Sequence, residues 1–307
     1  MKKKVIITIV SIIGVLIIGI GAYIAYLYNY VEKTANKMYE PVGEETKTEA
    51  KQKEEALGNK KPISILLMGV DEREGDVGRT DTLIVMTLNP KTGKMQMVSI
   101  PRDTRAEIVG KGTTNKINAA YAYGGVKMTL DTVEEFAGID MDYYIQVNME
   151  ALSDLVDAVG GITVNNDLDW IDEGYYKKGY HYKKGTLQLD GAKALGFVRM
   201  RHLDPEGDFG RNERQRKVIT AIIDQAASIK SVSHFDNILN ALGSNVKTNI
   251  TFDEMMEIQK NYRNVRNNIE QYEIKGSNAT INGSYYLVVP DEEKAKVKTM
   301  LEENLGE

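Results

Sequence analysis

The N-terminus of this 307-residue chain is three consecutive lysines followed by a long uncharged run. The run extends from Val5 to Tyr28, which is 24 residues, and about 20 apolar residues span the hydrocarbon core of a membrane. A cleavable signal has an apolar region of only about 7–15 residues and a small-x-small cleavage site, and no clear Ala-x-Ala ends this run. Tyrosines near its end are typical of an interfacial aromatic belt. We therefore expect an uncleaved transmembrane anchor.

Charge around the run predicts its orientation. The lysine cluster of residues 1–4 is expected to stay in the cytoplasm, so the chain after the anchor of residues 5–28 faces outward. The opposite orientation would need positive charge after the span, where glutamates offset Lys33 and Lys37. Residues 29–61 are rich in Glu and Lys and show no apolar face, which predicts a solvated stalk or a partly helical linker. Residues 62–307 would then form an extracellular domain of a single-pass protein of the cell membrane.

Composition excludes several functional classes. The formal net charge of -5 argues against a nucleic-acid partner, because nucleic-acid-binding domains are strongly basic. The chain has no cysteine, which excludes disulfides, thiolate metal sites and cysteine nucleophiles. Its three histidines show no metal-ligand spacing, so a His-rich zinc site is not expected.

Apolar patterning indicates strands that alternate with helices. Near-continuous apolar runs predict strands buried on both faces, and residues repeating at helical spacing predict helices. The expected strands are 63–70, 82–88, 94–100, 143–147, 197–200 and 285–289. The expected helices are 115–123, 126–136, 149–159, 190–195, 208–229, 235–242, 252–261 and one that begins at 291. This alternation favours a three-layer α/β domain.

The distribution of arginine indicates an anion site. Of 11 arginines, nine lie in a few short segments near turns or element ends. The planar guanidinium binds phosphate through two parallel hydrogen bonds and stays charged when desolvated, whereas lysine is a point charge. These nine are Arg73, Arg79, Arg102, Arg105, Arg199, Arg201, Arg211, Arg214 and Arg216. Surface ion pairs with nearby acidic residues are the alternative.

Spacing predicts that some of these side chains converge. Arg199 and Arg201 are two apart, so on a strand they would share a face. Arg211 and Gln215 are four apart on the expected long helix and would share one side, with Arg214 adjacent. That helix begins near Asp208, and backbone N–H groups at a helix N-terminus also favour an anion.

Carboxylates accompany the arginines at the ends of expected strands. Asp71 closes the first strand and Asp81 opens the second, and ligands usually bind at strand ends of α/β sheets. Two oxygen ligands beside a phosphate suit Mg²⁺, although either aspartate could instead cap a turn or pair with Arg79. Arg102 and Asp103 directly follow the third strand, and Lys116 is expected to add charge to the same pocket.

Together these segments resemble the LytR-CpsA-Psr family of cell-wall glycopolymer ligases, and within it the teichoic acid transferases of Gram-positive bacteria. The resemblance runs from about Pro62 to Thr251. It rests on an ordered set of motifs: Val70-Asp71-Glu72-Arg73, Arg79-Thr80-Asp81-Thr82-Leu83, Ser99-Ile100-Pro101-Arg102-Asp103-Thr104, Lys116-Ile117-Asn118-Ala119-Ala120-Tyr121, Asp157-Ala158-Val159-Gly160-Gly161-Ile162, Leu189-Asp190-Gly191, Val198-Arg199-Met200-Arg201, Gly207-Asp208-Phe209-Gly210-Arg211 and Arg214-Gln215-Arg216.

The resemblance implies a three-layer α/β/α sandwich with a central mixed sheet, preceded by one transmembrane helix, and a long groove for a polyprenyl chain. It implies transfer of a polyprenyl-pyrophosphate-linked glycopolymer, with wall teichoic acid as the polymer, to peptidoglycan. Mg²⁺ would be the cofactor, held by Asp71 and Asp81. The residues expected to bind the pyrophosphate are Arg79, Arg102, Lys116, Arg199, Arg201, Asp208, Arg211, Arg214 and Gln215.

The expected chemistry is attack by a muramic acid C6 hydroxyl on phosphorus, with release of polyprenyl phosphate. Arg79, Asp81, Arg102 and Asp103 are the expected catalytic residues, with Asp81 or Asp103 as candidate base. Two alternatives stay open: a hydrolase that uses water on the same lipid pyrophosphate, and a non-enzymatic regulator that only binds the lipid carrier. We assign no chemistry to the tail after about Thr251.

Overall fold

The computed structural model describes residues 25–43, 47–71, 78–228, 240–243 and 245–306. The expected anchor of residues 5–28 lies mostly outside these ranges, as do Arg73 and most of the helix expected at 235–242. Within the described ranges, no helix combines the length and the apolar character that crossing a membrane requires.

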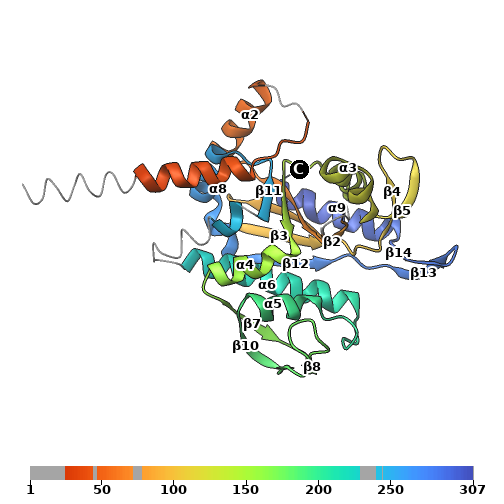
Figure 1. The fold of residues 1–307 in the computed structure, drawn as a ribbon. Coiled ribbons are helices and arrows are strands. Elements are labelled where there is room, and N and C mark those ends of the chain that lie inside the picture. The colour runs from red at the N-terminus through yellow and green to blue at the C-terminus, as the bar shows by residue number, and fades with distance from the viewer. Residues whose placement is uncertain (1–24, 44–46, 72–77, 229–239, 244, 307) are drawn as a thin grey trace, which may run out of the picture.

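A mixed six-stranded sheet forms the centre of the molecule (Figure 1). Its strand order is β11-β6-β1-β2-β3-β12, in which β1/β2, β2/β3 and β11/β6 are antiparallel and β1/β6 and β3/β12 are parallel. The strands are β1 (Ile63–Val70), β2 (Thr80–Asn89), β3 (Lys94–Ser99), β6 (Tyr143–Asn148), β11 (Val246–Thr248) and β12 (Ile269–Glu273). The prediction of a central mixed sheet is confirmed.

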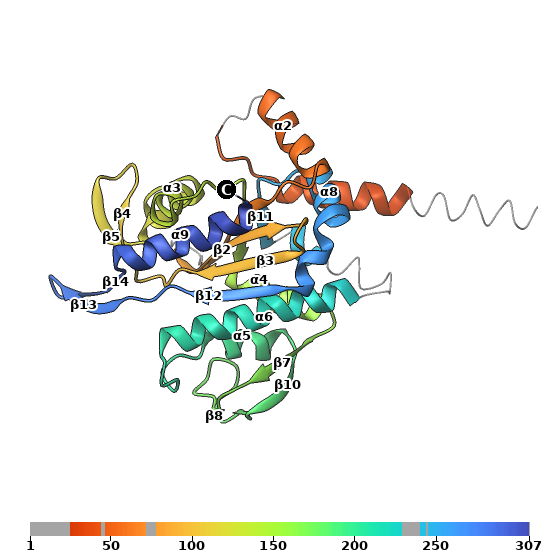
Figure 2. The ribbon, with the colours of Figure 1, turned by 180° about the vertical axis from the view of Figure 1, so that it is seen from behind.

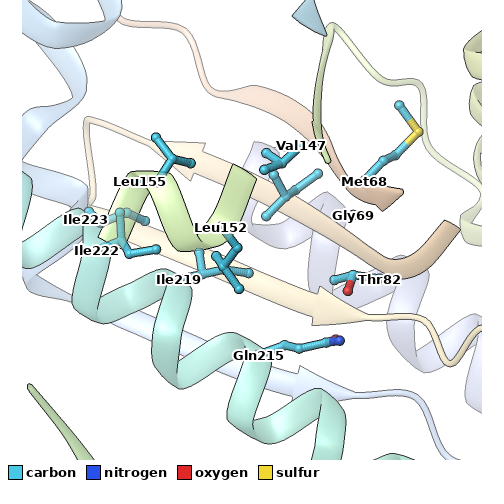
Figure 3. Close-up of a pocket in the computed structure, with 11 residues that line it drawn as sticks. Met68, Gly69, Thr82, Val147, Leu152, Leu155, Gln215, Ile219, Ile222 and Ile223 are labelled. Atoms are coloured by element: carbon cyan, nitrogen blue, oxygen red, sulfur yellow. The ribbon is translucent and has the colours of Figure 1, made fainter. Parts of the chain in front are cut away.

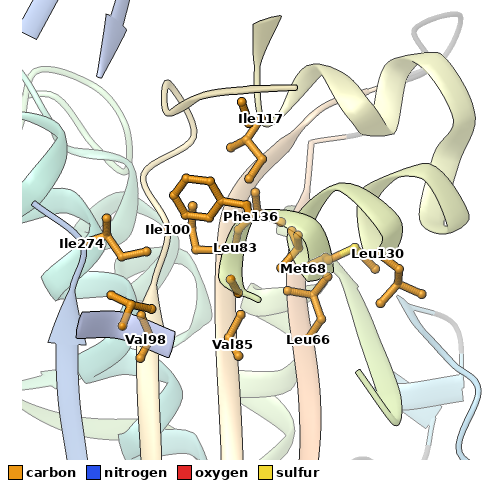
Figure 4. Packing of buried hydrophobic residues seen from close by; sticks show 14 of the residues in the cluster. Leu66, Met68, Leu83, Val85, Val98, Ile100, Ile117, Leu130, Phe136 and Ile274 are labelled. Carbon is orange, nitrogen blue, oxygen red and sulfur yellow. The ribbon is translucent and has the colours of Figure 1, made fainter. Parts of the chain in front are cut away.

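Strand β1 shows why the apolar runs form the central strands. All eight of its residues are buried, because alternate side chains pack into different cores on the two faces of the sheet. Leu66 and Met68 point to one core, which Figure 4 shows with Val85 and Val98 of the neighbouring strands. Ile65 belongs to the core on the opposite face. The continuous apolar sequence therefore reflects burial on both sides.

Helices cover both faces of the sheet (Figures 1 and 2). One face packs against α3 (Ala119–Ala137) and α9 (Asp291–Leu305), whose side chains complete the first core. The other face carries α4 (Met149–Ala158), α5 (Gly191–Arg199), α6 (Asp208–Ser228) and α8 (Phe252–Tyr262), followed by the 3-10 helix η1 (Arg263–Asn267). Helix α6 crosses this face with its N-terminus near the end of the sheet where β1 ends and β2 begins (Figure 3).

Four hairpins or short strand pairs surround this core. The pairs β7 (Ile162–Asn166) with β10 (Gly185–Leu189), and β8 (Trp170–Ile171) with β9 (His181–Tyr182), pack beyond α5 and α6. The pairs β4 (Arg105–Ile108) with β5 (Thr113–Lys116), and β13 (Ser277–Ile281) with β14 (Ser284–Val288), project from one end of the molecule (Figures 1 and 2). An isolated bridge joins Thr104 to Leu287, so segments far apart in sequence meet there.

Two predicted elements are wrong. Residues 197–200 are not a strand, because α5 continues from its N-cap Asp190 through Arg199, and Ala194, Phe197 and Val198 repeat at helical spacing on its buried side. Residues 115–123 are not one helix: β5 includes Asn115 and Lys116, and α3 begins at Ala119. The α3 backbone then bends at residues 124–125, where a glycine adopts a φ of +61°.

The segment expected to be a solvated stalk packs on the domain. A helix over residues 25–38 buries Met38, and α2 (Lys47–Gly58) buries Leu57 completely in the core beneath α8. The Glu40 N–H donates to the Thr248 carbonyl at 2.8 Å, which ties this segment to the edge strand. The prediction that this stretch has no apolar face is wrong. It failed because its few apolar residues are scattered among many charged ones and show no visible periodicity.

Candidate functional site

Acidic and basic side chains meet at a place where two elements begin and a third has just ended. Asp81 lies at the start of β2, Arg102 follows β3, and Asp208 begins α6. Arg102 Nη1 donates to Asp81 Oδ1 at 2.6 Å, and its Nε lies 3.5 Å from Asp208 Oδ2. The predicted convergence of strand ends and the helix N-terminus is therefore confirmed for these three residues. The first and the last of them, Asp81 and Asp208, are 127 positions apart in the sequence.

Asp208 organises a cluster of guanidinium groups. Arg211 Nη2 donates to Asp208 Oδ2 at 2.9 Å, and Arg201 Nε lies 3.8 Å from Oδ1. Arg102 contacts the same carboxylate, so three guanidinium groups share one aspartate. This arrangement holds the arginines in fixed directions while leaving positive charge for an anion.

The net pKa shifts of Arg102 and Arg211 have opposite directions. Burial favours the neutral form of Arg102, but the hydrogen bond and charge of Asp81, with Asp208 and Asp103, raise its pKa above the ordinary value. Burial lowers the pKa of Arg211; Asp208 opposes this shift, and the positive charge of Arg102 adds to it. Arg211 is therefore a buried cation whose charge Asp208 offsets only in part, and an added anion would stabilise its charged form.

A polar cavity of about 210 Å³, which we call the arginine pocket, opens beside this cluster. Its lining residues are Asp71, Asp81, Tyr175, Val198, Arg199, Arg201, His202, Arg211 and Gln215. In the part of the chain that the structure describes, the buried Arg211 Nε and Gln215 Oε1 have no hydrogen-bond partner. Buried polar atoms are almost always bonded, so these two groups indicate a site for a ligand.

An apolar cavity of about 140 Å³, which we call the apolar pocket, adjoins the arginine pocket (Figure 3). It lies between α4, α6 and the sheet. Gln215 lines both cavities, and Thr82 in the apolar pocket follows Asp81 in the arginine pocket. The apolar lining comprises Leu67, Met68, Val147, Leu152, Leu155, Ile219, Ile222 and Ile223. A ligand with a phosphate group and an apolar chain would match the two cavities.

Asp103 and Lys116 form the opposite rim of the cluster. Lys116 Nζ lies 2.6 Å from Asp103 Oδ1, and Arg102 Nε lies 3.7 Å from Oδ2. Asp103, Lys116 and Arg102 all lie outside the lining of the arginine pocket, but Arg102 links Asp103 to the lining residue Asp81. The predicted charge of Lys116 at the site is therefore neutralised in part by Asp103.

Arg199 and Arg201 both line the arginine pocket, although not for the predicted reason. Arg199 ends α5 and Arg201 lies just beyond it, so the two residues do not share the face of a strand. The turn after Met200 brings Arg201 back towards the N-terminus of α6.

Arg79 and Arg214 lie outside the lining of the arginine pocket. Arg79 is exposed and lies just after residues 72–77, which the structure does not describe. Arg214 is buried on another side of α6, where its Nε donates to the Phe197 carbonyl at 3.0 Å and its Nη1 pairs with Asp204. Its Nη2 bonds the Met200 carbonyl. Arg214 thus holds the turn that carries Arg201 against the helix.

Sequence reasoning missed a buried polar network that fixes α6 to the sheet. Arg216 Nη1 donates to Ser99 Oγ at 2.8 Å and its Nη2 donates to Glu273 Oε2 at 3.1 Å. Asn212 Nδ2 donates to Glu273 Oε1 at 2.8 Å. Burial raises the pKa of Glu273, and the charge of Arg216 opposes the shift. The distribution of arginine singled out Arg216, but no role was assigned to its partner Glu273, which lies in the tail after Thr251.

The carboxylates offer a limited set of metal ligands. Asp71 and Asp81 line the same cavity, and Asp81 also binds Arg102. Across the described residues, no group of three or more acidic or histidine side chains is arranged to hold a metal ion. Mg²⁺ is commonly held by one or two carboxylates together with phosphate oxygens and water, so this donor set suits it only in company with a phosphorylated ligand.

A mixed α/β domain that sets an arginine pocket beside an apolar pocket defines a class of site that suits a ligand carrying both a phosphate group and an apolar chain. The LytR_cpsA_psr family model matches residues 25–303, and the chain belongs to this family. The match extends beyond the 62–251 range of the sequence motifs at both ends, and it includes the packed N-terminal segment and β12 to α9.

Named relatives are similar over almost their whole length. The polyisoprenyl-teichoic acid–peptidoglycan teichoic acid transferase TagU of Bacillus subtilis (strain 168) is 46% identical over 304 residues, which is 99% of this chain and 97% of the relative. The crystal structure of B. subtilis TagU is 45% identical with a TM-score of 0.64, covering 80% of this chain and 97% of that one. The structure of TagT bound to LIIa-WTA is 32% identical with a TM-score of 0.71, covering 81% and 93%.

Proposed function

We propose that this protein attaches a polyprenyl-pyrophosphate-linked glycopolymer, wall teichoic acid, to peptidoglycan. The carrying observation is that Gln215 lines both the arginine pocket and the apolar pocket, because a lipid pyrophosphate needs both environments at one junction. The named relatives are teichoic acid transferases that join the polymer to peptidoglycan, and the chain matches them along its length.

The reaction is a phosphoryl transfer. The C6 hydroxyl of a muramic acid residue attacks the phosphorus nearer the glycopolymer, and a new P–O bond forms. The P–O bond to the bridging oxygen breaks, and polyprenyl phosphate leaves with the electron pair. The hydroxyl proton passes to a base. Positioning and charge stabilisation supply most of the catalysis in such reactions.

The arginines would stabilise charge on the pyrophosphate. Arg211 lines the arginine pocket and has a buried Nε without a hydrogen-bond partner among the described residues, and Arg201 and Arg102 contact the same Asp208 carboxylate. Preorganised donors of this kind contribute about 10²–10³ each in rate. Asp208 is a positioning residue, since it orients the three guanidinium groups.

A base for the hydroxyl proton would be Asp81 or Asp103. Asp81 is paired with Arg102 at 2.6 Å and Asp103 with Lys116 at 2.6 Å. Asp103 does not line the cavity in which Asp81 would bind Mg²⁺, so a metal ion would lower the basicity of Asp81 rather than that of Asp103, and we therefore favour Asp103.

Mg²⁺ would be held by Asp71 and Asp81 in the arginine pocket, with pyrophosphate oxygens and water completing its shell. It would neutralise negative charge on the phosphates and thereby make phosphorus more susceptible to attack.

The lysines at the N-terminus and the uncharged run after them favour a membrane anchor, with the domain on the outer surface of the cell membrane. That location would place both pockets at the leaflet where a polyprenyl pyrophosphate presents its head group.

The test is product analysis with the full chain in detergent, a lipid-pyrophosphate glycan, peptidoglycan fragments and Mg²⁺. We expect mass spectra to show polymer joined to the fragments through a phosphodiester, with polyprenyl phosphate released. Free phosphorylated polymer as the product would instead establish the hydrolase alternative. Binding without Mg²⁺-dependent turnover would establish the lipid-carrier-binding regulator.

A further inference from the structure

The β13–β14 hairpin of the C-terminal tail reaches the rim of the site. The Leu287 N–H donates to the Asp103 carbonyl at 2.9 Å, so β14 is bonded to the residue that follows Arg102. The Leu287 side chain is buried in the core between the sheet and helices α3 and α9, which fixes this strand in place. The hairpin therefore continues the Asp103 rim outward, on the side of Arg102 opposite to the apolar pocket.

Tyr285, two residues before Leu287 on β14, also lies beside this rim. Lys116 Nζ, which pairs with Asp103, lies 5.8 Å from the centre of the Tyr285 ring. Burial, with the negative charges of Asp103 and Asp208, raises the pKa of its phenol, as expected for a group close to both aspartates. Nevertheless 43% of the Tyr285 surface is exposed. An aromatic ring thus stands in solvent at the entrance to a charged site.

Other polar groups share the Tyr285 face of the hairpin. Because Tyr285 pairs with Thr280 and Leu287 with Asn278, these four side chains lie on one face. The Tyr285 hydroxyl donates to Asn278 Oδ1 at 2.8 Å, which holds the ring, and both Thr280 and Asn278 are exposed. We call Tyr285, Asn278 and Thr280 the hairpin face.

The hairpin is uncharged in a protein that is otherwise rich in charge. Residues 276–290 contain no Asp, Glu, Lys or Arg, whereas 27% of the whole chain is charged. An exposed surface of aromatic ring, amide and hydroxyl groups matches a neutral polyhydroxylated ligand, whose C–H face packs on the ring and whose hydroxyl groups bond the amide. The cation beside this face, Lys116, is paired with Asp103, so the face offers little positive charge to a phosphate-bearing polymer.

We infer that the hairpin face is the binding site for the sugar backbone of the acceptor glycan. This inference rests on the proposed function, because it assigns to that reaction the surface that holds the acceptor beside Asp103. The hairpin face binds one or more neutral sugar rings and thereby directs a hydroxyl towards the phosphorus in the arginine pocket.

The opposite face of the hairpin supplies a control. Tyr286 points away from Tyr285 and is partly buried, and its hydroxyl lies 3.4 Å from Asn115 Oδ1 on β5. Tyr286→Phe therefore removes a phenol from the same strand without changing the hairpin face. Tyr285→Ala removes the ring, Tyr285→Phe keeps it, and the exposed Asn278→Ala removes its support.

The experiment measures the affinity of peptidoglycan glycan fragments for the full chain in detergent, without donor, and then the acceptor KM and donor KM of transfer. We expect Tyr285→Ala to weaken glycan binding and to raise the acceptor KM by about tenfold or more, with the donor KM unchanged. Tyr285→Phe and Tyr286→Phe should stay within about twofold of the wild type, and Asn278→Ala should give a smaller rise than Tyr285→Ala.

Unchanged glycan affinity in both Tyr285→Ala and Asn278→Ala would overturn the inference. An increase confined to the donor KM would also overturn it, because it would assign the hairpin face to the donor polymer. The binding arm separates the two proposals. If glycan binds the wild type and fails to bind Tyr285→Ala while no transfer occurs, the acceptor site stands and the proposed reaction fails.

Discussion

Arg211 and Arg214 lie three residues apart on α6 and are equally buried, at 6% and 5% exposure. Arg214 uses its Nε, Nη1 and Nη2 on Phe197, Asp204 and Met200, whereas Arg211 bonds Asp208 and leaves a buried Nε without a partner among the described residues. Burial alone therefore does not distinguish a structural arginine from a ligand-binding one. The distinction lies in an unbonded N–H group on a side chain that lines the arginine pocket, because Arg216 also has an unbonded buried Nε among the described residues but lies outside that pocket.

The contrast between Arg211 and Arg214 is tested most strongly by replacing Arg214, the structural arginine. Arg214→Leu would leave the buried Asp204 without its partner, together with two carbonyl groups, and breaking a buried pair in this way costs about 3–5 kcal/mol. Denaturant unfolding of the full chain should show this loss. Arg263→Leu, at an exposed site, is the control and should be nearly neutral. An unchanged unfolding midpoint for Arg214→Leu would break the distinction.

Removal of the ligand-binding arginine should have the reverse effect. Arg211→Ala is expected to reduce the transfer rate by about 10²–10³, because a preorganised donor to the pyrophosphate is lost. Its free energy of unfolding should change little or rise, since a poorly compensated buried charge disappears. Initial rates with Arg263→Ala as control measure the effect, and near-normal transfer by Arg211→Ala would remove the arginine pocket from the mechanism.

The apolar pocket sharpens the comparison by testing the lipid end of the ligand. Ile223 lines this pocket, whereas Ile219 and Ile222 also pack against core clusters. Ile223→Ala should weaken binding of a long polyprenyl pyrophosphate by about tenfold, through loss of contact with a few methylene groups. A short-chain analogue should bind both proteins equally. Equal weakening of both ligands would mean that the lipid does not occupy the pocket.

The smallest expected effect is the pH dependence of stability that Glu273 contributes. Its raised pKa means that the ionised form is less favourable in the folded than in the unfolded protein. The stability contribution is therefore full below the ordinary carboxyl pKa and is lost as pH rises through the raised value. Glu273→Gln keeps a hydrogen-bond acceptor for Arg216 and cannot ionise. The wild-type free energy of unfolding should fall relative to this variant across that pH range, and parallel pH profiles would contradict the assignment.

Much of the fold was predictable because its signals are local. The apolar runs of β1 to β3 and the helical repeat of α6 depend on burial patterns that the sequence displays directly. The strand predicted at 197–200 failed because four apolar and basic residues cannot distinguish a strand from the last turn of a capped helix. Leu57 escaped notice because its apolar partners come from distant segments.

The site was predictable only in part. Asp81, Arg102 and Arg211 lie at element ends, and the positions of those ends followed from the pattern. The different roles of Arg211 and Arg214 were not predictable, because they depend on which side of α6 faces the turn at Met200. Glu273 and Tyr285 required the sheet order and the bond between β14 and Asp103, and neither can be read from local sequence.

The most direct measurement is the affinity of a polyprenyl pyrophosphate for the full chain in detergent, by titration calorimetry, with unfolding midpoints for the same samples. The wild type, Arg211→Ala and Arg214→Ala are compared. We predict that Arg211→Ala binds at least about tenfold more weakly with no loss of stability, and that Arg214→Ala loses stability with a smaller loss of affinity. Equal loss of affinity in the two variants, or wild-type affinity in Arg211→Ala, would contradict the account.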